Sequence, residues 1–243
     1  MNFSKVLFES AMLFSGIFLA LLLENYIDDN ELREKQEKLL GELILDLNET
    51  VADIANDIES NGEYLEQNKV LINAVNKTLD ELASEIAFES AQKICISYDF
   101  VVPKTSTFES IKSLGLDLIE DDSLRTQITA FYELTLSRIS TAEQRLYDFT
   151  SRECWPYISS NFEWAGPLET TERSISFGSD QTKMDWLADG KLKATSYDRL
   201  MTDSAFKFLL HESLIRRTFQ QLHYNRGLSE AQSIISQISE YLL

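Results

Sequence analysis

The spacing of hydrophobic residues predicts helices along most of the chain. Between residues 30 and 60, apolar side chains recur at steps of three, four or seven, which places them on one face of an α-helix. The stripe consists of Leu32, Leu39, Leu43, Leu47, Val51, Ile54 and Ile58. The same periodicity predicts helices over 63–93, 107–114 and 123–149, and from 203 to the end of the sequence. These stripes favour an all-α helical bundle.

The dipeptide Asn61-Gly62 predicts a turn after the first amphipathic helix. The helix over 63–93 is therefore expected to fold back antiparallel on the helix before it. The first stripe has the regular spacing of a coiled coil, but it is short and wide. Packing within the domain is the expected arrangement.

Polar residues mark the ends of the later helices. Ser106 and Glu109 have the spacing of a capping box, and Gly115 follows that helical run as a C-terminal glycine does. Asp121 and Asp122 precede the next run, where an aspartate cap is the simpler interpretation and a metal site the alternative.

An apolar segment precedes the first amphipathic helix. Residues 6–23 read VLFESAMLFSGIFLALLL, about the minimum length that spans a hydrocarbon core. No small-residue cleavage site follows it, and its apolar residues surround the helix, which argues against a signal peptide and against a soluble core helix. We predict a tail at 1–5, a single transmembrane helix at 6–26 that continues as one rod into the amphipathic helix, and a helical domain at 27–243.

Three residues of the predicted span lie near one face of a helix. Glu9, Gly16 and Ala20 are separated by seven and four residues. Gly16 and Ala20 form a small-xxx-small pair that permits close approach of a second helix. Glu9 either lies at headgroup depth in contact with water or faces a partner helix, because ionisable groups within spans avoid lipid.

Residues 155–202 lack a helical period and are rich in aromatic residues. A packed loop excursion with short helices is expected here. The candidate partner-binding side chains are Trp155, Phe162, Trp164 and Trp186. The preferred alternative is that these rings close one end of the helical bundle.

Composition narrows the function classes. The chain has 8 glycines and 3 prolines, too few for the many turns of a β-sandwich or barrel. Its net charge of −18 argues against nucleic acid and against binding to anionic lipid through basic patches. Cys95 and Cys154 have no metal-binding spacing, and the sequence leaves open whether they form a disulfide or remain free thiols.

The sequence shows no catalytic or metal-binding motif. His211 and His223 are twelve residues apart and have no partner at ligand spacing. Phosphate-binding, dinucleotide-binding and nucleophile-elbow motifs are also missing from it. We therefore expect a protein that is not an enzyme and has no cofactor or metal.

Two stretches together resemble a bacterial family. The first consists of Glu9, Gly16, Ile17, Ala20 and Asn25-Tyr26, followed by a charged helix from Glu31. The second consists of Thr107–Ser113, Gly115, Leu118-Ile119, Asp122–Arg125 and Phe131–Glu133. In this order they resemble an uncharacterised family of small single-pass membrane proteins with an N-terminal Glu/Gly anchor helix and a helical domain. The chain departs from that family in having Tyr26 where an indole is usual, and only Lys5 as a basic residue before the anchor.

The resemblance implies a location but no activity. It implies the bacterial inner membrane, with the N-terminus cytoplasmic and the bulk of the chain periplasmic. The count of Lys and Arg on the two sides of the span favours the opposite orientation, although long domains translocate largely regardless of charge.

The leading functional hypothesis is a membrane-anchored homo-oligomer that acts as a scaffold or sensor without catalysis. The alternative is a small oligomeric pore or membrane effector with Glu9 lining one mouth. Both hypotheses need contacts between copies of the chain in the lipid bilayer, and neither identifies a second protein.

Overall fold

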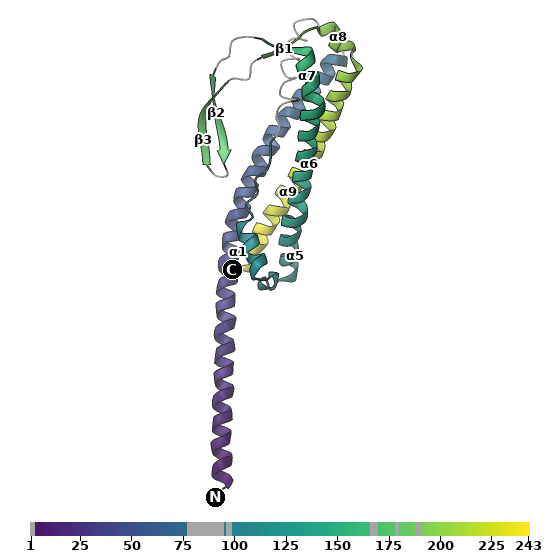
Figure 1. Cartoon of the computed structure of the whole chain (residues 1–243). Helices are drawn as coiled ribbons and strands as arrows, with labels where there is room; N and C mark the ends of the chain where they lie inside the picture. The colour runs from purple at the N-terminus through teal and green to yellow at the C-terminus, as the bar shows by residue number, and fades with distance from the viewer. Residues whose placement is uncertain (1–2, 77–94, 96–98, 166–169, 178–179, 188–190) are drawn as a thin grey trace.

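The chain forms a bundle of long helices from which one helix projects (Figure 1). The computed structural model describes residues 3–76, 95, 99–165, 170–177, 180–187 and 191–243. The side chains of residues 3–11, 13, 21, 25, 28, 29 and 164–192 lie outside this description. Most of the described residues are helical, which confirms the predicted helical fold class.

Helix α1 (Phe3–Asn76) is one unbroken helix of 74 residues. At about 1.5 Å per residue it is about 110 Å long. The prediction of a continuous rod is confirmed, but the predicted turn at Asn61-Gly62 is wrong. Asn61 is buried, and its Nδ2 donates a hydrogen bond to the carbonyl oxygen of Arg217 at 3.0 Å. This packing holds the dipeptide inside the helix. Residues 77–94, where the predicted second helix would continue, lie outside the described residues.

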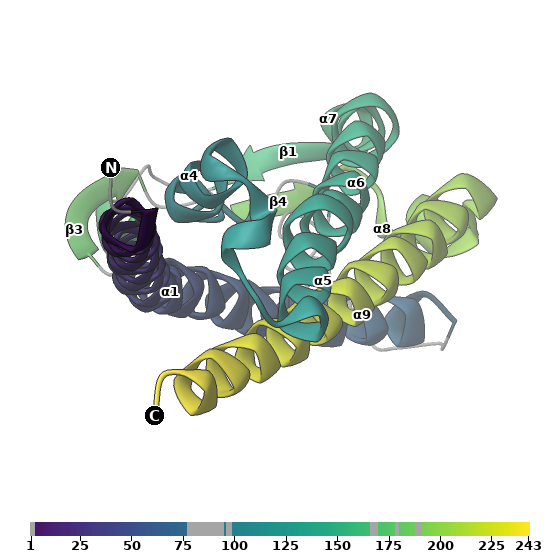
Figure 2. The ribbon, with the colours of Figure 1, turned by 90° about the horizontal axis from the view of Figure 1, so that it is seen from below.

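The other helices pack along the second half of α1. One column runs through α5 (Asp122–Ala130), α6 (Leu136–Phe149) and α7 (Trp155–Asn161), joined by π-helical segments at Phe131–Thr135 and Thr150–Cys154. Helix α9 (Ser204–Tyr241) is antiparallel to that column. Viewed from below, α9 lies along α1, and α5 and α6 lie beside α9 (Figure 2).

Three shorter elements complete the helical part among the described residues. They are α4 (Ser106–Leu114), a 3-10 turn (Leu116–Leu118) and α8 (Tyr197–Thr202). The carboxyl end of α9 returns to the level where the bundle begins, and there Gln36 Nε2 donates to the Tyr241 hydroxyl at 3.0 Å. The part of α1 before Gln36 therefore projects alone from the bundle (Figure 1).

The excursion after α7 contains strands, so the expectation of a loop with short helices is wrong for most of it. Strands β1 (Phe162–Ala165) and β4 (Lys191–Ala194) pair antiparallel. Strands β2 (Thr170–Phe177) and β3 (Asp180–Leu187) form a second antiparallel pair. Thr and Ile residues favour extended backbone, and only two residues separate β2 from β3, a length typical of a hairpin.

Two apolar clusters fill the bundle. The first lies toward the end from which α1 projects and includes Leu40, Leu43, Leu47 and Ile54, each at most 1% exposed. Three of these four belong to the predicted stripe, which is the packed face from Leu39 to Ile58, whereas its first member, Leu32, is 55% exposed. Full burial of one such side chain contributes about 1.5–3 kcal/mol. The second cluster, around Leu71, Leu146, Phe149 and Phe206, fills the other end.

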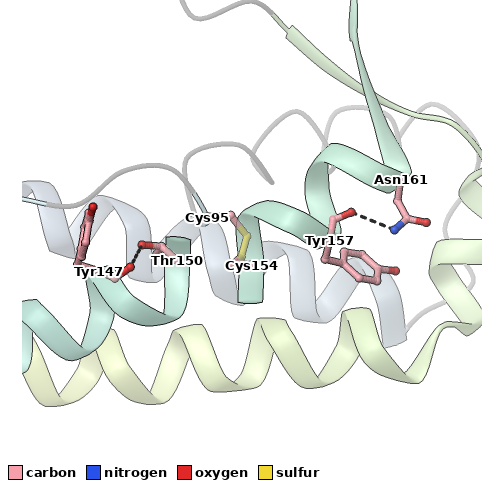
Figure 3. The surroundings of a disulfide bond; sticks show 6 residues. All are labelled: Cys95, Tyr147, Thr150, Cys154, Tyr157 and Asn161. Atoms are coloured by element: carbon pink, nitrogen blue, oxygen red, sulfur yellow. Dashed lines mark hydrogen bonds between the residues drawn. A yellow bond between two sulfur atoms is a disulfide. The ribbon is translucent and has the colours of Figure 1, made fainter. Parts of the chain in front are cut away.

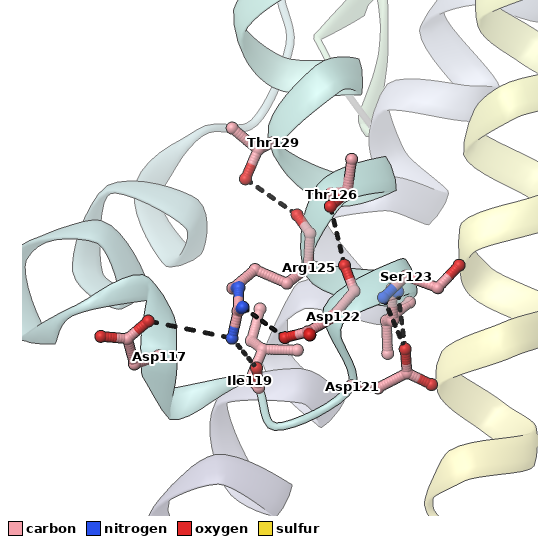
Figure 4. Close-up of polar contacts among 9 residues, drawn as sticks. Asp117, Ile119, Asp121, Asp122, Ser123, Arg125, Thr126 and Thr129 are labelled. Atoms are coloured by element: carbon pink, nitrogen blue, oxygen red, sulfur yellow. Dashed lines mark hydrogen bonds and ion pairs between the residues drawn. The ribbon is translucent and has the colours of Figure 1, made fainter.

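The start of α5 follows the sequence prediction. Asp121 Oδ1 accepts hydrogen bonds from the backbone N–H groups of Ser123 at 2.8 Å and Leu124 at 3.0 Å (Figure 4). Arg125 reaches back from the first turn, donates to the carbonyl oxygen of Ile119 at 3.0 Å and pairs with Asp122. Asp121 is therefore the helix cap, and Asp122 is the ion-pair partner of Arg125.

The start of α4 differs from the predicted capping box. Asp46 of α1 accepts hydrogen bonds from the Ser106 hydroxyl at 3.1 Å and from the Thr107 backbone N–H at 3.0 Å. The Ser106 hydroxyl thus donates a hydrogen bond to a carboxylate of α1 instead of accepting one from a backbone N–H group of α4. Because an anion at a helix N-terminus is stabilising, Asp46 also fixes α4 against α1. Gly115 ends α4 with φ of 111°, as predicted.

The two cysteines form a disulfide between Cys95 and Cys154 (Figure 3). Their Cα atoms lie 5.4 Å apart, and the bond closes a loop with a sequence separation of 59 residues. Cys154 is fully buried and Cys95 is 3% exposed. Of the two states that the sequence left open, the structure contains the disulfide.

Two helical glycines, one in α1 and one in α9, provide a matched test of the helix geometry and packing. A Cβ at Gly62 would meet no atom within 4 Å, whereas one at Gly227 of α9 would lie 2.7 Å from Cδ1 of Ile139. We expect Gly62→Ala to stabilise the bundle by about 0.5–1 kcal/mol, because Ala is the better helix former. Gly227→Val should destabilise it by about 2 kcal/mol or more through overpacking. Thermal unfolding of the full chain, followed by circular dichroism, measures both; destabilisation by Gly62→Ala would contradict the continuous helix.

Reduction of the disulfide should destabilise the bundle. For a loop of this length the chain-entropy model gives about 4 kcal/mol, and measured losses run to about 2–5 kcal/mol. We expect the double variant Cys95→Ala/Cys154→Ala to show this loss and to become insensitive to reductant. Denaturant unfolding with and without dithiothreitol is the measurement; equal midpoints for the wild type under the two conditions would contradict the bond.

Candidate functional site

The residues predicted to line a membrane-helix interface all belong to the projecting part of α1. Gly16 and Ala20 are exposed, and a Cβ added at Gly16 would meet no atom within 4 Å. The side chain of Glu9 lies outside the description. In the described part of the chain, no helix combines the length and the apolar character needed to cross a membrane.

Of the four aromatic candidates, only Trp155 and Phe162 have described side chains, and the two differ in exposure. Phe162 is 6% exposed, and its ring centroid lies 6.0 Å from that of Phe206, so it is a core residue at the end of the bundle. Trp155 begins α7 and is 38% exposed. The backbones of Trp164 and Trp186 belong to β1 and β3, in two different strand pairs, and their side chains lie outside the description.

A groove lies between α6 and α9. Its volume is about 470 Å³, within the range of about 300–1,000 Å³ typical of ligand sites. We name it the basic groove. It is lined by Ser137, Arg138, Thr141, Ala142 and Arg145 of α6 and by Glu212, Ile215, Arg216, Phe219 and His223 of α9.

The basic groove carries positive charge on a strongly acidic protein. Arg138 and Arg145 form no ion pair with any described residue within 4.0 Å. Arg216 pairs with Glu212 at 3.1 Å, and its guanidinium carbon lies 5.0 Å from the centroid of the Phe149 ring. These two contacts hold Arg216 in place, while the α6 arginines remain available to an anion.

The pKa of His223 reflects this surrounding charge. Partial burial lowers the pKa of His223, and the nearby guanidiniums of Arg138, Arg226 and Arg145 lower it further. The imidazole is therefore neutral at pH 7. It supplies a hydrogen-bonding group at the groove without adding to the positive charge.

A cluster of polar and charged groups lies buried inside the bundle. Arg217 of α9 is 1% exposed; its Nη1 donates to Asn61 Oδ1 at 3.4 Å, and its guanidinium carbon lies 4.6 Å from the centroid of the Tyr64 ring. The Tyr224 hydroxyl donates to Glu143 Oε1 at 2.9 Å and accepts from Gln220 Nε2 at 2.7 Å. These bonds connect α1, α6 and α9 in the centre of the bundle.

Carboxyl groups outnumber the arginine in this cluster. Burial raises the pKa of Asp57 to about 8, and the neighbouring Asp99 and Glu143 contribute to this rise. Burial also raises the pKa values of Asp99 and Glu143, although Arg217 acts in the opposite direction on Asp99. Oδ2 of Asp57 is buried and accepts no hydrogen bond from a described residue. The cluster therefore retains protons at a pH where exposed carboxyls are ionised.

Neither the groove nor the buried cluster was predicted from the sequence. A signal for the cluster exists, because Asp57, Asn61, Tyr64 and Asn68 repeat at steps of four and three along one face of α1. Polar residues at these positions interrupt an apolar stripe, and buried polar groups need partners. The groove had no comparable signal, since it depends on the distance between α6 and α9.

Neither feature has the arrangement of a metal site. No group of three or more His, Cys, Asp or Glu side chains in the described part of the chain has the arrangement that holds a metal ion. The acids of the cluster lie near one another. Glu143 accepts hydrogen bonds from the Tyr224 hydroxyl and from the backbone N–H of Val101. Such contacts connect the helices of the bundle and alter the pKa values of the carboxyl groups. The groove instead offers exposed guanidinium groups beside apolar side chains, an arrangement that can bind a ligand with both negative charge and apolar surface.

Comparison with known proteins adds no relative, since no protein-family model, curated protein or solved structure matches the chain.

The buried acids should make stability depend on pH. The folded state holds a proton on Asp57 up to about pH 8, whereas the unfolded chain releases it near the ordinary value of 3.8. The folded state therefore binds more protons between these values, and stability falls as the pH rises through them. We expect Asp57→Asn to stabilise the bundle by about 1–3 kcal/mol at pH 8 and little at pH 4. Unfolding at both pH values measures this, with Glu59→Gln, an exposed acid on the same helix, as control.

Proposed function

We propose that the protein is a membrane-anchored, homo-oligomeric scaffold or sensor whose helical domain lies outside the inner membrane. The anchor is residues 6–26, and α1 continues from it into the core of the bundle. Anchor and bundle then move as one body, because no turn or linker separates them. This continuity is the observation on which the proposal rests.

The surface of the projecting helix supports the anchor. Large apolar side chains there are exposed around most of the circumference, not along one stripe. They are Met12, Phe14, Ile17, Phe18, Leu19, Leu22 and Leu23, with exposures between 49% and 75%. Water is a poor environment for such a surface. A lipid bilayer covers it on all sides.

One face of α1 supports a contact between copies. Positions 9, 27 and 45 are separated by eighteen residues each, or five helical turns, so that Glu9, Ile27 and Leu45 lie on one face together with Gly16 and Ala20. Ile27 and Leu45 are 54% and 65% exposed, although Leu45 lies beside the bundle. A second α1 packed in parallel would cover this face, with the small residues permitting close approach inside the membrane.

The disulfide supports a periplasmic location for the bundle. Disulfides between buried cysteines persist in oxidising compartments and are rare in the cytosol. Together with the family resemblance, the bond between Cys95 and Cys154 favours a cytoplasmic N-terminus and an exported domain. This orientation is opposite to the one that the count of basic residues favours. That count says little here, because long domains translocate largely regardless of charge.

A role without catalysis agrees with the chemistry of the described side chains. The perturbed carboxyls lie inside the bundle, and the exposed groove offers cations and apolar surface. The alternative of a pore lined by Glu9 depends on a side chain outside the description, and it remains a prediction of the sequence.

The mass of the purified complex tests this proposal. We expect the full chain in a mild detergent to have the mass of a dimer or larger oligomer by light scattering. Gly16→Leu should shift it toward the monomer, because the larger side chain separates the two helices at their closest contact.

The matched control is Phe18→Leu, which changes the opposite side of the same turns. It should leave the mass unchanged. A wild-type chain that is monomeric under all detergent conditions would contradict the homo-oligomer, as would a Gly16→Leu variant with the wild-type mass.

A further inference from the structure

The basic groove is bordered by an exposed apolar stripe on α9. Phe208, Ile215, Phe219 and Leu222 are separated by seven, four and three residues, and each is 49–63% exposed. These spacings place the four side chains on one face of α9. The stripe extends over about 21 Å, or about four helical turns. Nothing in the described part of the chain covers it.

A row of guanidinium groups lies beside this apolar stripe. Arg138 and Arg145 line the groove from α6, about two helical turns apart, and Arg216 lies at the α9 wall. Arg226 continues the series about one turn beyond His223, where it pairs with Glu230 at 2.7 Å. The surface therefore combines an apolar strip with a row of guanidinium groups, of which Arg216 and Arg226 are paired with glutamates and Arg138 and Arg145 are not, on a chain whose net charge is −18.

We infer that the basic groove binds an acidic amphipathic helix of a partner protein. The apolar face of such a helix packs against the stripe of α9, at residues spaced by three, four and seven. Its carboxylates then lie beside Arg138 and Arg145, the two groove arginines that have no ion pair within the described chain. Both properties of the groove are used at once by this class of partner.

The length and shape of the surface favour a helix over a small anion. A compact ligand would use the centre of the groove and leave Phe208 and Leu222 at the two ends of the stripe exposed. A helix of about four turns covers the whole stripe.

Charge distinguishes the partner from a second copy of this chain. Two copies joined through this face would bring the arginines of one against the arginines of the other, and like charges in contact are costly. The inference goes beyond the proposed function, since the groove lies on α6 and α9 and the proposed contact between copies lies on α1.

Binding of a designed peptide tests the inference. The full chain is reconstituted in nanodiscs of phosphatidylcholine, and the probe is a labelled helical peptide of about five turns with leucines spaced by three and four residues and glutamates on the other face. The control peptide carries lysines in place of the glutamates. Fluorescence anisotropy, with empty nanodiscs subtracted, should show binding of the acidic peptide at least about tenfold tighter than that of the basic one.

Variants of the chain separate the groove from the general charge. Arg138→Glu/Arg145→Glu should weaken binding of the acidic peptide about tenfold or more. The matched control is Lys38→Glu/Lys69→Glu, which makes the same change in net charge at exposed positions of α1; it should alter binding by less than about twofold, since distant exposed charges are screened. Phe219→Ser/Leu222→Ser should also weaken binding about tenfold, through the loss of apolar contact.

Four outcomes would overturn the inference. They are no binding of the acidic peptide, equal binding of the basic peptide, equal effects of the two double charge variants, and a fall in the mass of the complex on Arg138→Glu/Arg145→Glu. The last would make the groove a contact between copies. If that variant misfolds, Arg138→Gln/Arg145→Gln replaces it under the same criteria. A monomeric chain that binds the peptide would contradict the proposed oligomer and leave this inference standing.

Discussion

The continuity of α1 is the constraint on which the rest of the structure depends. Its carboxyl half supplies the buried face against which α9 and the α5–α7 column pack, and its amino half projects without any cover from the described chain. Because a helix is stiff over this length, the direction of the projecting segment also sets the direction of the bundle. The groove, the buried cluster and the disulfide are thereby held at fixed heights above the proposed anchor.

The interior of the bundle combines two kinds of contact. Apolar clusters at its two ends supply most of the driving force, as in other helical bundles. Between them, Arg217 and Tyr224 bond to groups on α1 and α6, which favours one register of the helices over its neighbours. The buried carboxyls oppose this gain at high pH, because their charged forms are poorly solvated inside the bundle.

The two proposed contact surfaces lie on different helices and differ in charge. The α1 side carries the apolar face with Ile27 and Leu45, and the side formed by α6 and α9 carries the basic groove. A contact between copies through α1 would leave the groove accessible. The proposed scaffold and the proposed binding of an acidic helix are therefore compatible in one assembly.

Local patterns in the sequence were reliable where the interaction itself is local. The stripe from Leu39 to Ile54, the aspartate cap at Asp121 and the positive φ of Gly115 all depend on neighbours within a few residues. Predictions failed where a distant residue changed the outcome. Arg217 holds Asn61 inside a helix that its dipeptide would end, and Asp46 replaces the expected cap of α4.

The sequence by itself therefore determined the helical class, the buried face of α1 and the apolar segment at its start, because periodicity and length are properties of a single segment. Only the tertiary structure decided the pairing of Cys95 with Cys154, the strand pairs after α7, the buried acids around Asp57 and the groove between α6 and α9. Each of these depends on the distance between segments far apart in the chain. No local pattern encodes such a distance; the packing of helices sets it.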